Sequence, residues 1–223
     1  EVGDPTLSSE RGFNTEISLS VDRPNYFMSL TLFNNEISDY IYLQDEMDDH
    51  DEEEHEEEHE EEHEEEHNHG GLIAAAYEQE DASFSGYEFE IGTSIDFDMG
   101  QLTFTYARDQ TNASLDSGPR VPRIAPARDT FTVDGSISGF DTRLSYQRVS
   151  DQSRVAENEE PTDGYDMLNL SVTRTFSLSA SELDVTVYGR NLLDEVARRH
   201  TSFVKEEAPL PGRNLGVKLY YRL

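Results

Sequence analysis

Residues 213–223 read RNLGVKLYYRL, and this stretch decides the fold. Every second residue from Leu215 to Leu223 is apolar or aromatic, and Lys218, Tyr220 and Arg222 fall between them. Successive side chains of a β-strand point to opposite sides, so a period of two residues predicts a strand with one apolar and one polar face. The end of the chain is therefore expected to be a half-buried strand.

The same period recurs upstream, as where Phe13, Ile17 and Leu19 alternate with polar residues. It predicts nine strands, at about residues 11–21, 26–42, 73–97, 101–110, 128–138, 140–149, 165–177, 182–190 and 213–223. The connections between them alternate in length along the chain. We expect all the long connections on one side of the sheet, at residues 43–72, 111–127, 150–164 and 191–212.

A soluble antiparallel barrel or sandwich would show the same alternation. Strands of about ten residues or more, long connections on one side and aromatic residues near strand ends favour a transmembrane barrel. The predicted fold class is therefore all-β, an antiparallel transmembrane β-barrel with apolar faces toward lipid and polar faces toward a wet lumen. Bacterial barrels of this kind close with an even number of strands, so residues 1–223 are expected to form the C-terminal part of a larger barrel.

One segment breaks the pattern: residues 50–69 read HDEEEHEEEHEEEHEEEHNH. Imidazole nitrogen suits Zn, Cu and Ni, and carboxylates neutralise charge and add ligands. Residues 45–69 are therefore predicted to be a metal-binding loop inserted between strands. The candidate metal ligands are His50, His55, His59, His63, His67, His69, Asp48, Asp49, Asp51, Glu54, Glu58, Glu62 and Glu66.

The spacing of the histidines suggests how the loop works. Residues four apart are neighbours on a helix, so successive histidine pairs can grip one ion. Seventeen acids between Asp45 and Glu66 repel one another, so we expect the metal-free loop to be disordered and a cation to relieve the repulsion. The alternative is a solvated acidic loop without a specific function.

Composition excludes other classes of function. The net charge of −31 and the lack of a basic patch argue against nucleic acid as a partner. The chain has no cysteine, which excludes thiolate zinc sites and disulfides. No nucleophile, histidine and carboxylate grouping is evident outside the loop, so we do not expect an enzyme.

Several segments together resemble the TonB-dependent outer-membrane receptors. The ending PLPGRNLGVKLYYRL (209–223) resembles the last strand of that family, and RNLLDE (190–195), NEISDYI (35–41), DASFSGYE (81–88) and RVPRIAPAR (120–128) are similar to its internal motifs. The similarity covers nearly the whole chain in the family's order. Within the family, the His-rich loop together with HTSFVK (200–205) resembles the zinc-uptake receptors.

The resemblance implies a protein in the outer membrane of a Gram-negative bacterium that takes up zinc. Such receptors are twenty-two-stranded barrels with an N-terminal plug, which this chain does not contain. Zn²⁺ would be the transported ligand, other divalent metals remaining open, and no organic cofactor is implied. The implied partners are outer-membrane lipid, the TonB energy-coupling complex acting through the missing N-terminal part, and the barrel assembly machinery, which would contact the C-terminal strand.

His200 is a separate candidate metal ligand in a long connection. Arg198 and Arg199 beside it disfavour a cation, although nearby carboxylates could offset their charge, at Asp194, Glu195, Glu206 and Glu207. An ordinary polar loop residue is the alternative. Two other functions remain open: a receptor of the same fold for an iron-siderophore, haem, nickel or cobalt, and a surface protein that buffers metal without transport.

Overall fold

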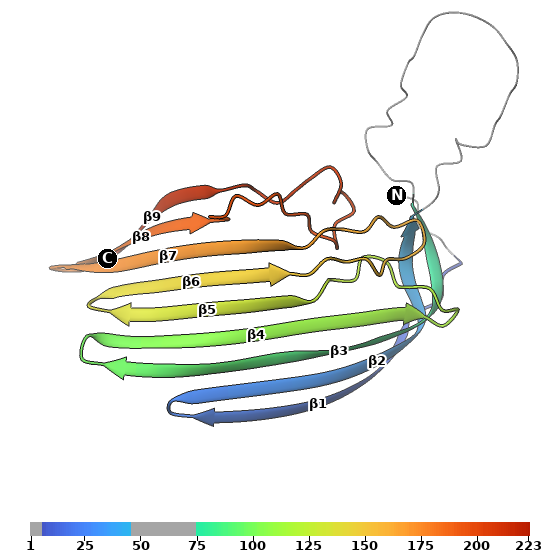
Figure 1. Ribbon diagram of the computed structural model, residues 1–223, viewed down its shortest axis with the longest axis horizontal. Coiled ribbons are helices and arrows are strands. Elements are labelled where there is room, and N and C mark those ends of the chain that lie inside the picture. The colour runs from blue at the N-terminus through green and yellow to red at the C-terminus, as the bar shows by residue number, and fades with distance from the viewer. Residues whose placement is uncertain (1–5, 46–74) are drawn as a thin grey trace, which may run out of the picture.

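The computed structural model describes residues 6–45 and 75–223. These residues form nine strands: β1 (Arg11–Arg23), β2 (Tyr26–Asp45), β3 (Ala75–Phe97), β4 (Gly100–Leu115), β5 (Arg128–Ile137), β6 (Phe140–Val149), β7 (Tyr165–Leu178), β8 (Ser181–Arg190) and β9 (Asn214–Arg222). The strands make one sheet in chain order, and each is antiparallel to its neighbours (Figure 1). The predicted all-β antiparallel fold is confirmed. In the described ranges, no helix is long and apolar enough to cross a membrane.

Tight turns and long connections lie at opposite ends of the sheet (Figure 1). Two-residue turns join β1 to β2, β3 to β4, β5 to β6 and β7 to β8. In the β5–β6 turn both Ser138 and Gly139 have positive φ, 51° and 79°, as a type I′ hairpin turn requires. All long connections leave from the other end, as the sequence predicts, and we call this end the rim.

Two strands reach further toward the rim than their sequence predicts. β2 continues to Asp45, and β4 continues through Asn112 to Leu115. The extra part of β4 is rich in polar residues typical of loops, but its backbone pairs with β3 from Ala82 to Gly86. Cross-strand pairing therefore overrides the local preference for a turn.

The register separates the sheet into an apolar and a polar face. Val187 pairs with Val217 and Val185 with Leu219, whereas Thr186 pairs with Lys218. Leu215, Val217 and Leu219 are 64–70% exposed, so the apolar face is not covered by any other described part of the chain. An uncovered apolar face with this alternation is what a barrel presents to lipid.

An aromatic row marks one limit of the apolar face. Ring centroids lie 6.2 Å apart for Phe89 and Tyr106, 4.8 Å for Tyr106 and Phe131, and 6.2 Å for Phe131 and Tyr146. On the rim side of this row, the Arg108 guanidinium pairs with the Asp129 carboxylate at 2.7 Å. Aromatic rings followed by ion pairs are typical of the membrane–water boundary, so the strands extend beyond the membrane at the rim.

A small hydrophobic core lies at the rim, where β2 and β3 bend. Its buried residues are Ala82, Ala113, Leu115 and Val121. The β2–β3 register shifts between Ile37 and Tyr40, and Asp39 in this bulge has a φ of 56°. The Asp39 backbone N–H donates to the Asp81 carboxylate at 2.8 Å. The bulge turns the tip of the hairpin along the rim, past the connections of the later strands (Figure 1).

Candidate functional site

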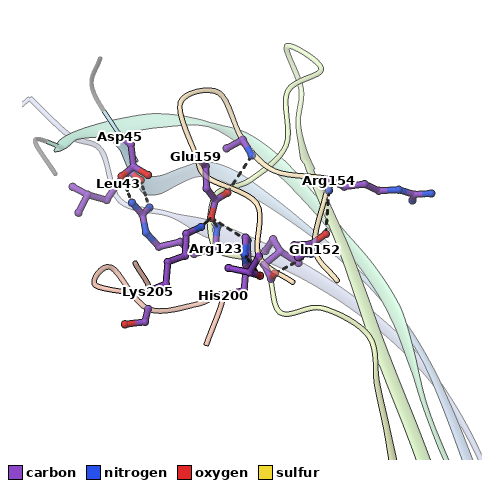
Figure 2. A network of polar contacts seen from close by, with 12 residues as sticks. Leu43, Asp45, Arg123, Gln152, Arg154, Glu159, His200 and Lys205 are labelled. Atoms are coloured by element: carbon purple, nitrogen blue, oxygen red, sulfur yellow. Dashed lines mark hydrogen bonds and ion pairs between the residues drawn. The ribbon is translucent and has the colours of Figure 1, made fainter. Parts of the chain in front are cut away.

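The His-rich loop begins and ends at the rim. Asp45, the last residue of β2, is the register partner of Ala75, the first residue of β3. The predicted ligands between these two lie outside the described residues: His50, His55, His59, His63, His67, His69, Asp48, Asp49, Asp51, Glu54, Glu58, Glu62 and Glu66. The residues that hold the base of the loop are described, and they form a polar network (Figure 2).

Arg123, from the β4–β5 connection, holds the end of β2. Its guanidinium pairs with the carboxylate of Asp45 and donates to the carbonyl oxygen of Leu43 at 2.7 Å. The guanidinium carbon also lies 3.8 Å from the centroid of the Phe203 ring, which belongs to the β8–β9 connection. Asp45 is only 4% exposed, so this ion pair is shielded from water. The base of the loop is therefore fixed to two other connections.

The β6–β7 connection adds two further bonds to the same strand end. The Gln44 side-chain amide donates to the carbonyl oxygen of Glu157 at 2.5 Å. The Asn158 side-chain amide donates to the carbonyl oxygen of Asp45 at 3.1 Å. Three connections thus meet at the residues that precede the His-rich loop.

Glu159 is the centre of the network. Its Oε1 accepts hydrogen bonds from the Arg123 backbone N–H at 3.0 Å, from Lys205 Nζ at 3.1 Å and from His200 Nε2 at 3.1 Å. Its Oε2 accepts one from the Ala156 backbone N–H at 3.1 Å. The Glu159 side chain is 1% exposed. One buried carboxylate therefore joins the β4–β5, β6–β7 and β8–β9 connections.

The surroundings of Glu159 keep it ionised. Burial alone would raise the pKa of its carboxyl, but the hydrogen bonds from His200, Ala156 and Lys205 lower that pKa from 4.5 to about 2. Each donor stabilises the charged form of the acceptor. The negative charge of Glu159 is thus a fixed part of the rim at neutral pH.

His200 lies inside this network rather than at the surface. The residue is 2% exposed; its Nε2 faces Glu159, and its Nδ1 lies 3.0 Å from the hydroxyl oxygen of Thr162. Both ring nitrogens therefore have protein partners, and a metal ion would have to displace one of them. In the described parts of the chain, no group of three or more His, Asp or Glu side chains is arranged to hold a metal. A metal role for His200 stays a prediction.

The carboxylate that balances the charge around His200 is not one of its sequence neighbours. Glu159 supplies it from the β6–β7 connection, while Asp194 instead pairs with Arg213 at 3.4 Å. The Arg198 guanidinium turns toward backbone, donating to the carbonyl oxygens of Lys205, at 2.6 Å, and Glu206. No local sequence pattern marks Glu159 as the partner of this histidine.

A meander of long antiparallel strands with one uncovered apolar face and all long connections at one rim defines part of an outer-membrane β-barrel wall. Residues 1–192 match the family described as TonB dependent receptor-like, beta-barrel, and the chain belongs to this family. Membership places the chain in the outer membrane of a Gram-negative bacterium, in a family of receptors rather than enzymes, as the sequence predicts.

A solved structure with a similar fold is that of the copper transporter OprC. The TM-score is 0.74 at 13% sequence identity, and the match covers 97% of this chain and 32% of the transporter. At this identity the likeness concerns the fold. The chain spans about a third of the length of that transporter.

Proposed function

We propose that the chain is part of a TonB-dependent receptor for zinc, in which the loop between β2 and β3 captures the ion outside the cell. The observation that carries the proposal is the run of histidines and acids inserted between Asp45 and Ala75, two register partners at the rim. Imidazole and carboxylate together suit Zn²⁺. The aromatic row on the apolar face lies between the rim and the tight turns, which supports a rim outside the membrane.

The network at the rim holds the base of the His-rich loop beside the other long connections, so an ion bound by the loop would lie near them. Arg123 and Asn158 hold the last residue of β2 against connections that lie several strands away. The loop can then concentrate ions near the mouth of the barrel instead of away from it. Many overlapping ligands allow fast exchange, because no single ion is held in a closed tetrahedral cage.

The remaining steps follow from the family. Energy for import would come from the TonB complex, acting through an N-terminal part beyond these residues. Lipid would cover the apolar face, and the last strand, β9, would engage the barrel assembly machinery. Zn²⁺ is cargo in this scheme and needs no organic cofactor.

A receptor for another cargo is the second candidate, and the fold likeness to a copper transporter favours copper among metals. Carboxylates outnumber histidines in the loop, and the chain has no cysteine for Cu(I), which favours zinc. Iron-siderophore, haem, nickel and cobalt would use the same fold.

Competition for uptake separates these cargoes. Cells carrying the complete receptor would be given labelled zinc with an excess of unlabelled zinc, copper, nickel or cobalt. We expect unlabelled zinc to compete best. Stronger competition by copper would assign the receptor to copper, and binding at the surface without energy-dependent uptake would show a metal-buffering protein.

A further inference from the structure

One positive charge interrupts the apolar face near the tight turns. Arg174, on β7, is the register partner of Phe140 on β6 and of Val185 on β8. Val185 pairs in turn with Leu219. Residues that lie directly opposite each other on neighbouring antiparallel strands point to the same side of the sheet. The Arg174 side chain is therefore on the apolar face and not on the face that lines the lumen.

Arg174 is isolated from other charges on this part of the sheet. Between the level of the aromatic row and the tight turns, the register places every other charged side chain of β4 to β9 on the lumen side. These residues are Asp134, Asp141, Arg143, Glu182, Asp184, Arg190, Lys218 and Arg222. An arginine that faces lipid is costly at the membrane midplane and is tolerated near the membrane boundary. Its position along β7 therefore matters.

Arg174 lies at the level of a turn. Its partner Phe140 is the first residue of β6, directly after the β5–β6 turn. β7 continues to Leu178, so the β7–β8 hairpin extends beyond the β5–β6 turn (Figure 1). The tight turns of a membrane barrel lie at the end of its apolar band, in contact with water and headgroups. The Arg174 guanidinium is thus within reach of lipid headgroups.

Two aromatic rings contact the guanidinium. Its central carbon lies 4.5 Å from the centroid of the Phe140 ring and 5.5 Å from the centroid of the Phe176 ring. Phe176 is nearer than Arg174 to the β7–β8 turn, so the side chain extends toward the tight-turn end. The face of a ring attracts the cation but supplies no lone pair to its N–H groups. The rings therefore orient the guanidinium without satisfying its donors.

These donors have no acceptor in the described part of the chain. Within residues 6–45 and 75–223, the Arg174 side chain forms no ion pair and no hydrogen bond, and its contacts are the two rings. Arg108 and Arg143, in contrast, each pair with a carboxylate at 2.7 Å. The acceptors for Arg174 must come from outside the chain.

We propose that Arg174 binds the phosphate of a glycerophospholipid in the leaflet at the tight-turn end. This inference rests on the proposal that lipid covers the apolar face. The planar fork of a guanidinium matches two oxygens of one phosphate. Phe140 and Phe176 would contact the acyl chains beside that phosphate. A free phosphate ion has no apolar part and would gain nothing from these rings, so the lipid is the better fit.

Lipid binding by the complete receptor, purified in detergent and stripped of lipid, tests the proposal. Phosphatidylglycerol would be added stepwise, and the bound molecules counted by native mass spectrometry. We expect Arg174→Gln to weaken the retention of phosphatidylglycerol by about tenfold, because the variant loses a charged pair of hydrogen bonds. Diacylglycerol, which lacks the phosphate, should bind alike to the parent and the variant. An excess of inorganic phosphate should not displace the phospholipid.

Arg143→Gln is the matched control. Arg143 is on the lumen side of β6, and Asp134 pairs with it at 2.7 Å. Its loss should leave phosphatidylglycerol binding unchanged. Heat-modifiable mobility after insertion into phosphatidylcholine vesicles would show that each variant is a folded barrel.

Two results would overturn the phosphate site and leave the proposed receptor function untouched. One is equal retention of phosphatidylglycerol by the parent and Arg174→Gln, and the other is an equal loss in Arg174→Gln and Arg143→Gln. Failure of the parent itself to insert into vesicles would overturn the placement of the apolar face in lipid as well.

Discussion

Removal of the Glu159 carboxylate should release the rim connections from one another. In Glu159→Ala, the Arg123 and Ala156 backbone N–H groups and Lys205 Nζ lose their common acceptor. Lys205 is 3% exposed, so its ammonium group would remain buried without a counterion. A buried charge that loses its partner must either move to the surface or let water reach it.

Two estimates of the free energy lost in Glu159→Ala agree. The pKa of Glu159 falls from 4.5 to about 2 on folding, which corresponds to about 3 kcal/mol of stabilisation. Breaking a buried ion pair by removing one partner costs about 3–5 kcal/mol in other proteins. A local opening reaction that becomes easier by about 3 kcal/mol is about one-hundredfold more frequent.

Amide hydrogen exchange of the complete receptor measures this opening directly. The Arg123 and Ala156 amides donate to Glu159, so their exchange should accelerate by up to about one-hundredfold in Glu159→Ala. Amides in the middle of β5 and β6 should keep their protection. Glu160→Ala is the control, because Glu160 is exposed. If both variants exchange alike, the carboxylate of Glu159 does not hold the rim together and the reasoning is wrong.

The same carboxylate sets a pH dependence. Its pKa is lower in the folded protein than in the unfolded chain, so its contribution is complete above about pH 4.5 and is lost as the pH falls toward about 2. The difference in protection between the parent and Glu159→Ala should therefore shrink to less than half between pH 6 and pH 3. A constant difference across this range would show that another group is responsible.

Three further predictions concern the wall and the loop. Leu219→Arg near the membrane midplane should lower the stability of the folded barrel by about 2–4 kcal/mol and impair assembly of the complete receptor, whereas Lys218→Leu should have little effect. The fraction of heat-modifiable barrel on gels measures assembly, and the opposite result would mean an inverted register. A peptide of residues 45–71 should bind several Zn²⁺ ions at neutral pH and lose them below about pH 6, because a ligating imidazole must be neutral; calorimetry checks this, and equal binding when all six histidines are changed to Asn would assign the ions to carboxylates. Zn²⁺ should also induce helix in that peptide by pairing His55 with His59 and His63 with His67, visible by circular dichroism; binding without helix would contradict the pairing.

The strands were predictable because their signal is local. Side chains alternate along each strand, so the alternation predicts where the strands lie. Each strand pairs with the next in sequence, so the order of the strands in the chain is also their order in the sheet. β6, at Phe140–Val149, has the predicted bounds, and the last strand has the predicted faces, with Lys218 opposite Thr186 and Leu219 opposite Val185. Most other bounds differ by one to three residues, and the largest difference is in β4, where pairing with β3 extends a polar segment through Asn112 to Leu115.

The rim network was not predictable, because its partners are far apart in the sequence. Arg123 and Asp45 are 78 residues apart, and Lys205 and Glu159 are 46 apart. Glu159 is buried while its neighbour Glu160 is exposed, and nothing in the run of acids distinguishes them. The sequence predicts His200 as a potential metal ligand, but its two partners, Glu159 and Thr162, come from the β6–β7 connection. The metal ligands predicted in the His-rich loop remain predictions, since they lie outside the described residues.

The claim that the His-rich loop captures zinc is tested most directly by replacing its six histidines with Asn in the complete receptor. The measurement is zinc accumulation by cells that carry this variant. The acids and the length of the loop are unchanged in this variant, so the network around Asp45 and Arg123 should still form. When zinc is scarce, the variant should accumulate it much more slowly than the parent, and the two should converge at high zinc, because the loop acts by raising the local ion concentration. Equal accumulation at scarce zinc, with equal amounts of folded barrel, would contradict the assignment of zinc capture to this loop.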